Sequence, residues 1–205
     1  ANRRNNSEGC LMLNNQHPNK TIVYAGSDVF SVQPLKKVLS LKYKKVTVLT
    51  RPPKRQGRGM KEKNNPLAEF ALHNNLETLM PESPNDNNFI AKLEEKKYDL
   101  LISCAYGRIM SEKLFGCFHM GNINIHPSLL PRWRGPSPIE SSILEGDKIT
   151  GVSLMQMTEE LDAGPVYEQR SINMNGENTK TLSEKLTLLA GDMIEGFLPS
   201  FFEGD

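Results

Sequence analysis

The sequence predicts an α/β domain built on a doubly wound, mostly parallel sheet. From Thr21 onward, short β-prone runs alternate with stretches whose apolar residues recur at helical spacing, which is typical of such sheets. The run Tyr98–Ala105 is the most hydrophobic of these, as expected of a central strand buried on both faces. Ligands of doubly wound sheets bind beyond the carboxyl ends of the strands, so polar residues at those ends are candidates for function.

Each predicted strand is a short run of β-branched, aliphatic or aromatic residues that is bounded by polar or turn-forming residues. The first ends in Gly26-Ser-Asp28, and Pro127 ends the fourth. The predicted strands are Thr21–Ala25, Lys45–Thr50, Tyr98–Ala105, Gly121–Ile125, Thr150–Met157 and Val166–Met174.

The predicted helices have apolar residues at a period near 3.6 or carry a start signal. Pro66 suits the first turn of a helix, and Thr181-Leu-Ser-Glu184 has the pattern of a capping box. The predicted helices cover residues 30–41, 66–76, 89–97 and 137–145, with a last one beginning near Thr181. Residues 51–63 and 81–88 are predicted loops.

The composition is that of a globular protein. The chain has 205 residues, of which 38% are hydrophobic and 24% charged, enough for one domain with a real core. No apolar run approaches the roughly 20 residues of a membrane span, so no membrane partner is expected. The net charge of +1 means that any contact with nucleic acid must come from a local basic patch.

Residues 1–19 are rich in asparagine and lack apolar periodicity, so they are predicted to form a disordered leader before a domain that covers residues 20–205. The leader could be the remnant of an organellar targeting region or a simple polar tail. Cys10, Cys104 and Cys117 are scattered and odd in number, which favours a reducing compartment over a disulfide framework or a zinc site. Cys104 is interpreted as a core residue.

An amide and an imidazole end the predicted strand before Pro127. Alternation along a strand places Asn124 and His126 on the same side. An amide N–H can stabilise the oxyanion that forms when a carbonyl is attacked, and imidazole can carry a proton near neutral pH. Asp162, in a turn close to Gly164, is the candidate carboxylate that would orient the ring.

This pattern leaves alternatives open. His126 could be a structural residue, and Asp162 could cap local main-chain N–H groups. A serine hydrolase is disfavoured because the chain has no G-x-S-x-G elbow, and a nicotinamide enzyme is disfavoured because no G-x-G-x-x-G follows the first strand.

The segment Asn122–Ile139, with Asn124-Ile-His126-Pro-Ser-Leu-Leu-Pro131 at its centre, closely resembles the signature of the folate-dependent formyltransferases. The resemblance extends from about Thr21 to the end of the chain. It implies a Rossmann-like formyltransferase fold, with Asn124, His126 and Asp162 as the catalytic set. It also implies 10-formyltetrahydrofolate as the co-substrate and no metal.

The same resemblance assigns the pterin of the folate to main-chain groups, which can pair with its amide-like edge. The expected contacts lie in two segments and near the loop that ends at Asp162. The folate-binding residues are expected to be Gly107, Arg108, Ile109, Met110, Ser128, Leu129, Leu130 and Pro131.

The continuation Arg132-Trp-Arg-Gly135 is similar to the branch of the family that acts on methionyl-initiator tRNA. In that branch a basic loop enters the acceptor stem, and Arg58 occupies the matching place here. Clustered cations on a loop suit phosphate contacts, although such a run can also be a solvated charged loop. The expected tRNA-binding residues are Arg58, Arg55, Lys54, Lys61, Arg132 and Arg134.

Other functions stay open at this point. The chain could be a glycinamide-ribonucleotide formyltransferase, although it lacks the phosphate-binding loop expected after the first strand, or a non-catalytic module that binds folate or tRNA. A sugar-nucleotide formyltransferase and the hydrolase domain of a folate dehydrogenase are more distant alternatives. The tRNA-specific branch usually carries a second, C-terminal domain, so this chain is either a fragment or short form or a weaker tRNA binder. We expect a monomer in the mitochondrial matrix, with the cytoplasm as the alternative location.

Overall fold

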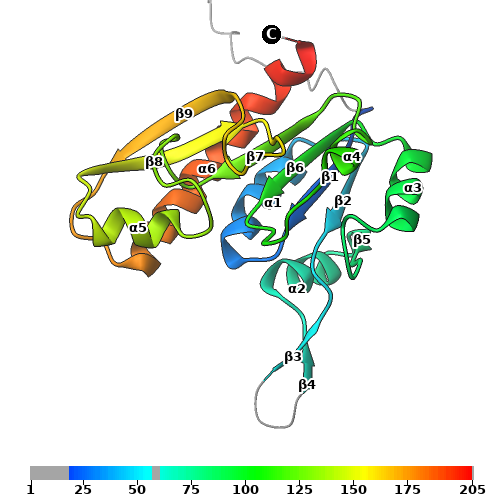
Figure 1. Cartoon of the computed structure of the whole chain (residues 1–205), viewed down its shortest axis with the longest axis horizontal. Coiled ribbons are helices and arrows are strands. Elements are labelled where there is room, and N and C mark those ends of the chain that lie inside the picture. Colours follow the sequence, from blue (N-terminus) through cyan, green and yellow to red (C-terminus); the bar gives the residue numbers. More distant parts are fainter. Residues whose placement is uncertain (1–18, 57–60, 205) are drawn as a thin grey trace, which may run out of the picture.

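The computed structural model describes residues 19–56 and 61–204 (Figure 1). Nearly all of the predicted leader, Cys10 and Arg58 lie outside the described residues. The predicted α/β class is confirmed, because a mostly parallel sheet with helices on both faces forms the body of the structure.

The main sheet has seven strands in the order β5-β2-β1-β6-β7-β8-β9. The pairs from β5 to β7 are parallel, whereas β7–β8 and β8–β9 are antiparallel. The most hydrophobic strand, β6, lies at the centre, as predicted. The strands are β1 Thr21–Gly26, β2 Lys45–Leu49, β5 Thr78–Leu79, β6 Leu100–Cys104, β7 Asn122–His126, β8 Ile149–Met155 and β9 Val166–Asn173.

Apolar residues from the two faces of the sheet form two cores. Residues of α1, α2, α5 and α6 pack on one face, and residues of α3 and α4 pack on the other. The α-helices are α1 Val32–Ser40, α2 Pro66–His73, α3 Asn87–Lys96, α4 Glu112–Phe115, α5 Pro138–Leu144 and α6 Thr179–Glu203, and a 3₁₀ turn spans Val29–Ser31.

The structure differs from the sequence predictions in short elements. The predicted loop 51–63 contains a hairpin, β3 Lys54–Gln56 and β4 Lys61–Lys63, which projects away from the main sheet (Figure 1). The two-residue strand β5 and the single-turn helix α4 were also not predicted, because elements this short carry almost no periodicity. The capping box of α6 pairs Asn178 with Thr181, so Thr181 is the third helical residue and not the cap.

Cys104 is fully buried in β6, in agreement with its interpretation as a core residue. Burial raises the pKa of its thiol to about 12, so it stays protonated at neutral pH and is a poor nucleophile.

Candidate active site

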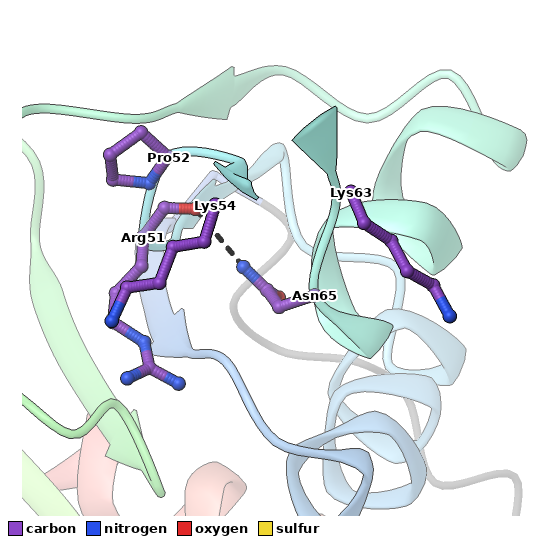
Figure 2. A pocket seen from close by; sticks show the side chains of 5 residues that line it. All are labelled: Arg51, Pro52, Lys54, Lys63 and Asn65. Atoms are coloured by element: carbon purple, nitrogen blue, oxygen red, sulfur yellow. Dashed lines mark hydrogen bonds between the residues drawn. The ribbon is translucent and has the colours of Figure 1, made fainter. Parts of the chain in front are cut away.

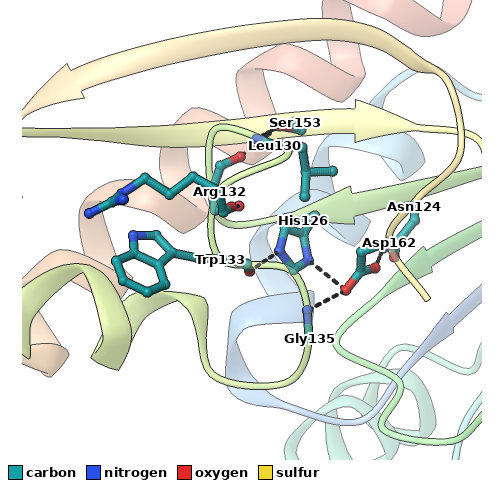
Figure 3. Close-up of polar contacts among 9 residues, drawn as sticks. Asn124, His126, Leu130, Arg132, Trp133, Gly135, Ser153 and Asp162 are labelled. Carbon is teal, nitrogen blue, oxygen red and sulfur yellow. Dashed lines mark hydrogen bonds and ion pairs between the residues drawn. The ribbon is translucent and has the colours of Figure 1, made fainter. Parts of the chain in front are cut away.

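Strand β7 and the loop after β8 bring together the three residues that the sequence singled out. The Asn124 side chain donates a hydrogen bond to Asp162 Oδ1 at 3.3 Å, across 38 residues of sequence. His126 Nδ1 lies 3.6 Å from Asp162 Oδ2 (Figure 3). The amide and the imidazole therefore face one carboxylate, as predicted from their alternation on the strand. The His126 and Asp162 side chains are only 6% and 8% exposed, so water screens their interaction weakly.

Asp162 is held in place by a main-chain contact that the sequence did not reveal. Its Oδ2 accepts a hydrogen bond from the Gly135 N–H at 2.8 Å. Both residues have positive φ angles, 50° at Asp162 and 99° at Gly135, a conformation that aspartate tolerates and glycine adopts freely. The carboxylate thus links the loop after β8 to the loop after β7.

The other nitrogen of His126 is also occupied. Nε2 lies 2.9 Å from the main-chain carbonyl oxygen of Trp133. Because a carbonyl oxygen can only accept, Nε2 carries the hydrogen, and Nδ1 is the nitrogen that faces Asp162. The 3.6 Å between Nδ1 and Asp162 Oδ2 exceeds the length of a hydrogen bond, so the hydrogen bond that holds the ring is the one at Nε2.

Asn122 is a further residue of this site that sequence reasoning missed. Its side-chain oxygen accepts from the main-chain N–H of Met157 at 2.6 Å, and its amide donates to the Met157 carbonyl at 3.3 Å. Asn122 is 3% exposed and lies on the same side of β7 as Asn124. The two hydrogen bonds between Asn122 and Met157 anchor the start of the loop that carries Asp162. The one available signal was the alternation of asparagines in Asn122-Ile-Asn124.

The predicted folate residues 107–110 follow β6 at the carboxyl edge of the sheet. Gly107 has a φ of 73° and is exposed, and Ile109 is 78% exposed. Within the described part of the chain, the main-chain N–H groups of Gly107 and Met110 have no hydrogen-bond partner, so they could pair with a pterin edge. Neighbouring Tyr106 is buried, and burial raises the pKa of its phenol to about 12.

The predicted folate turn 128–131 is tied to the sheet. Ser153 Oγ donates to the Ser128 carbonyl at 2.6 Å and accepts from the Leu130 N–H at 3.1 Å. Gln169 donates to the Leu130 carbonyl at 2.9 Å and to Ser153 Oγ at 2.8 Å. Ser153 and Gln169 therefore provide partners for the main-chain groups of Ser128 and Leu130. A role for this turn in folate binding stays a prediction.

The predicted tRNA residues lie in two places. Lys54, Arg55 and Lys61 belong to the β3–β4 hairpin, and the Lys54 side chain lines a small pocket at its base with Arg51, Pro52, Lys63 and Asn65 (Figure 2). The hairpin cations and the Arg132–Arg134 segment come from different elements. Arg132 is paired with Asp147, and Arg134 Nη1 lies 3.7 Å from Glu160. Arg58 lies outside the described residues.

Two further observations concern the described residues alone. None of their helices is long and apolar enough to cross a membrane. Among them, no group of three histidine, cysteine or carboxylate side chains is arranged to hold a metal ion.

Comparison with curated proteins identifies close relatives of the chain. It is 40% identical over 166 residues to a methionyl-tRNA formyltransferase of Buchnera aphidicola, a match that covers 80% of this chain and 53% of the relative. It is 36% identical over 185 residues to the methionyl-tRNA formyltransferase of Coxiella burnetii, which covers 90% of this chain and 59% of the relative. The chain therefore spans little more than half the length of these relatives.

Solved structures with the same fold are more distant in sequence. The phosphoribosylglycinamide formyltransferase of Bacillus halodurans superposes with a TM-score of 0.67 at 20% identity, covering 91% of this chain and 94% of that one. A sugar N-formyltransferase of a Shewanella species also has a TM-score of 0.67, at 19% identity, covering 90% and 70% of the two chains. At this level of identity, the likeness concerns the fold alone.

The family model described as formyl transferase matches residues 22–194, which include the main sheet except for Thr21 and contain the Asn124, His126 and Asp162 cluster. Because the match covers far more than half of the 205 residues, the chain belongs to the formyl transferase family.

Proposed function

We propose that this chain transfers the formyl group of 10-formyltetrahydrofolate to the amino group of methionyl-initiator tRNA. The observation that carries the proposal is the meeting of Asn124 and His126 at the Asp162 carboxylate, at the carboxyl end of β7. An amide donor, an imidazole and a carboxylate in one buried cluster are the groups that transfer of an acyl-type group requires.

Each of the three side chains has a task in the proposed transfer. The folate supplies the formyl group, and the neutral amine of the acceptor attacks its carbon. In the proposed reaction His126 is protonated on both ring nitrogens. The second amide hydrogen of Asn124 and the Nδ1–H of this imidazolium stabilise the oxygen that becomes negative. Asp162 stabilises the imidazolium and positions a water, which takes the proton that the amine loses and gives it to the leaving tetrahydrofolate nitrogen.

The segment 107–110, which follows β6 at the carboxyl edge of the sheet, can accommodate the folate. The N–H groups of Gly107 and Met110, which have no hydrogen-bond partner among the described residues, and the exposed residue Ile109 offer main-chain donors to a pterin. The Arg108 side chain is held by hydrogen bonds from its guanidinium to the Pro81 and Glu82 carbonyls. Gly107 to Met110 and the turn Ser128–Pro131 are the proposed folate contacts.

Two observations support tRNA as the acceptor over glycinamide ribonucleotide. The curated relatives named above are methionyl-tRNA formyltransferases, whereas the phosphoribosylglycinamide enzyme resembles this chain in fold only. The basic hairpin β3–β4 also projects from the sheet, where it could reach along an acceptor stem. Arg58, Arg55, Lys54, Lys61, Arg132 and Arg134 are the proposed contacts.

A formylation assay tests the proposal directly. The chain is incubated with 10-formyltetrahydrofolate and offered methionyl-initiator tRNA and glycinamide ribonucleotide in separate reactions. Formylation of the tRNA alone is the expected result. Formylation of the ribonucleotide alone would establish the alternative enzyme, and binding without turnover of either acceptor would establish a non-catalytic module.

We also propose the mitochondrial matrix as the location, with the cytoplasm as the alternative, and a monomeric state. The support for the location is the composition of residues 1–19, nearly all of which lie outside the described residues. A fluorescent fusion that retains residues 1–19 and one that lacks them would distinguish the two locations. Sedimentation of the purified chain would measure its oligomeric state.

A further inference from the structure

Asp147 lies between α5 and β8 and is not part of the cluster around Asp162. Its carboxylate accepts three hydrogen bonds, from Arg132 Nε at 3.1 Å, Arg132 Nη2 at 2.6 Å and the indole Nε1 of Trp133 at 2.7 Å. The Asp147 side chain is only 12% exposed. One carboxylate thus binds two successive residues of the segment that follows β7.

The two bound side chains also contact each other. The Arg132 guanidinium lies over the Trp133 ring, 4.2 Å from its centre (Figure 3). Arg132 makes a bidentate pair with the carboxylate, and the Trp133 indole donates a hydrogen bond to it. Together these bonds fix the orientation of both side chains and their distance from Asp147. The hydrogen bonds from Arg132 and Trp133 lower the pKa of Asp147, so it is ionised at neutral pH.

The main chain at Trp133 needs such a restraint. Its φ is 60°, a conformation that bulky residues rarely adopt and that persists only where the surroundings impose it. In this conformation the Trp133 carbonyl accepts the hydrogen bond from Nε2 of His126, 2.9 Å away. The side chain of Trp133 is therefore held by Asp147 while its carbonyl holds the imidazole.

We propose that Asp147 is a positioning residue for the reaction. Through Trp133, it keeps the hydrogen of neutral His126 on Nε2 and sets the plane of the ring, so that Nδ1 faces Asp162 and the substrate. The assignment of the ring hydrogen rests on the geometry alone. Its consequence for turnover rests on the proposed formyl transfer.

The state of the imidazole can be measured without any substrate. The four histidines of the chain are labelled with ¹⁵N, and the His126 signals are identified by their loss in His126→Asn. Trp133→Phe keeps an aromatic ring under Arg132 but removes the indole N–H, and Asp147→Ala removes the carboxylate. Both variants should shift neutral His126 from a single Nε2–H form to a mixture of the two forms.

A matched control removes a carboxylate that pairs with an arginine elsewhere. Glu168→Ala deletes the acceptor of the Arg170 Nε hydrogen bond on β9 and should leave the His126 signals unchanged. Unchanged His126 signals in folded Trp133→Phe would overturn the proposal, even if Asp147→Ala proves too unstable to purify. The melting temperatures of the two variants distinguish loss of the fold from loss of the orientation of the His126 ring.

Kinetics then tests whether the orientation matters for turnover. Trp133→Phe should lower kcat by up to about 10²-fold with little change in KM, because a misplaced imidazole affects the reacting geometry. A native kcat overturns the positioning role, whatever the NMR signals show. If the wild-type chain itself formylates neither acceptor, the proposed function fails, and the NMR comparison alone decides how Asp147 acts on His126.

Discussion

The carboxylate of Asp162 accepts a hydrogen bond from the main-chain N–H of Gly135, at a distance of 2.8 Å. The same carboxylate faces Asn124 and His126. The Asp162 side chain, which comes from the loop after β8, therefore contacts both strand β7 and the loop that follows β7. The contact with Gly135 is structural, and substitution can separate it from the proposed chemical role of Asp162.

Asp162→Asn should keep an acceptor for the Gly135 N–H but lose the charge that stabilises an imidazolium. Its new amide group would also point an N–H toward Asn124 or His126. We expect kcat to fall by about 10²–10⁴-fold while the melting temperature stays close to that of the wild type. Single-turnover formylation and a thermal melt measure both. Wild-type turnover would remove Asp162 from the chemistry.

Asn124→Ala removes one of the two proposed oxyanion donors. Loss of one such donor typically costs about 10²–10³-fold in kcat, with a smaller effect on KM. Steady-state formylation kinetics gives both constants. Asn88→Ala, on the exposed side of α3, is the matched control and should retain native kinetics. A kcat within a few-fold of the wild type would contradict the role of Asn124.

Asn122→Ala should lower the free energy of unfolding by about 1–3 kcal/mol, because it leaves the partly buried N–H of Met157 without its partner. Urea unfolding measures the change. Activity should fall as well, since the loop to Asp162 loses its anchor. Undiminished stability together with undiminished activity would show that this pair holds neither the loop nor the fold.

Lys54→Ala tests the hairpin as a contact for tRNA phosphates. Removal of one phosphate contact should weaken tRNA affinity and reduce the slope of log affinity against log salt by about 1. Filter binding over a range of salt concentrations measures both. Lys92→Ala, on the exposed side of α3, is the control and should change neither quantity. An unaltered slope in Lys54→Ala would place this lysine outside the tRNA interface.

The ion pairs of Glu77 should make stability depend on pH in the acid range. Hydrogen bonds from Lys45 and Lys96 lower the pKa of Glu77, whereas an unfolded glutamate has a pKa of about 4.3. Because the folded pKa is the lower one, the stabilisation is complete above the unfolded pKa and is lost as the pH falls through the folded pKa.

The melting temperature of Glu77→Gln should therefore lie below that of the wild type at pH 7, and the difference should shrink below about pH 4. Glu69→Gln, at an exposed position of α2, should show no such convergence. A Glu77→Gln difference that is constant from pH 7 to pH 3 would mean that the two lysines contribute nothing to stability.

The long elements of the fold could be predicted from the sequence because their periodicity is a local property. Every predicted strand and helix is present, and β6 is central because its residues are apolar on both faces. The hairpin, β5 and α4 could not be predicted, since three residues in a hairpin strand or four in a helix show no period. Their formation depends on pairing and packing with distant residues.

Some features of the candidate active site could likewise be predicted from the sequence, and others could not. The alternation of Asn124 and His126 on one strand and the resemblance of the segment around them are carried by neighbouring residues, so the sequence alone determined the amide, the imidazole and the family. Only the tertiary structure decided that Gly135 binds Asp162, that Asn122 holds Met157 and that Asp147 reaches His126 through Trp133. These contacts join loops that are distant along the chain, and the antiparallel pairing of β8 with β7 brings the loops together in space.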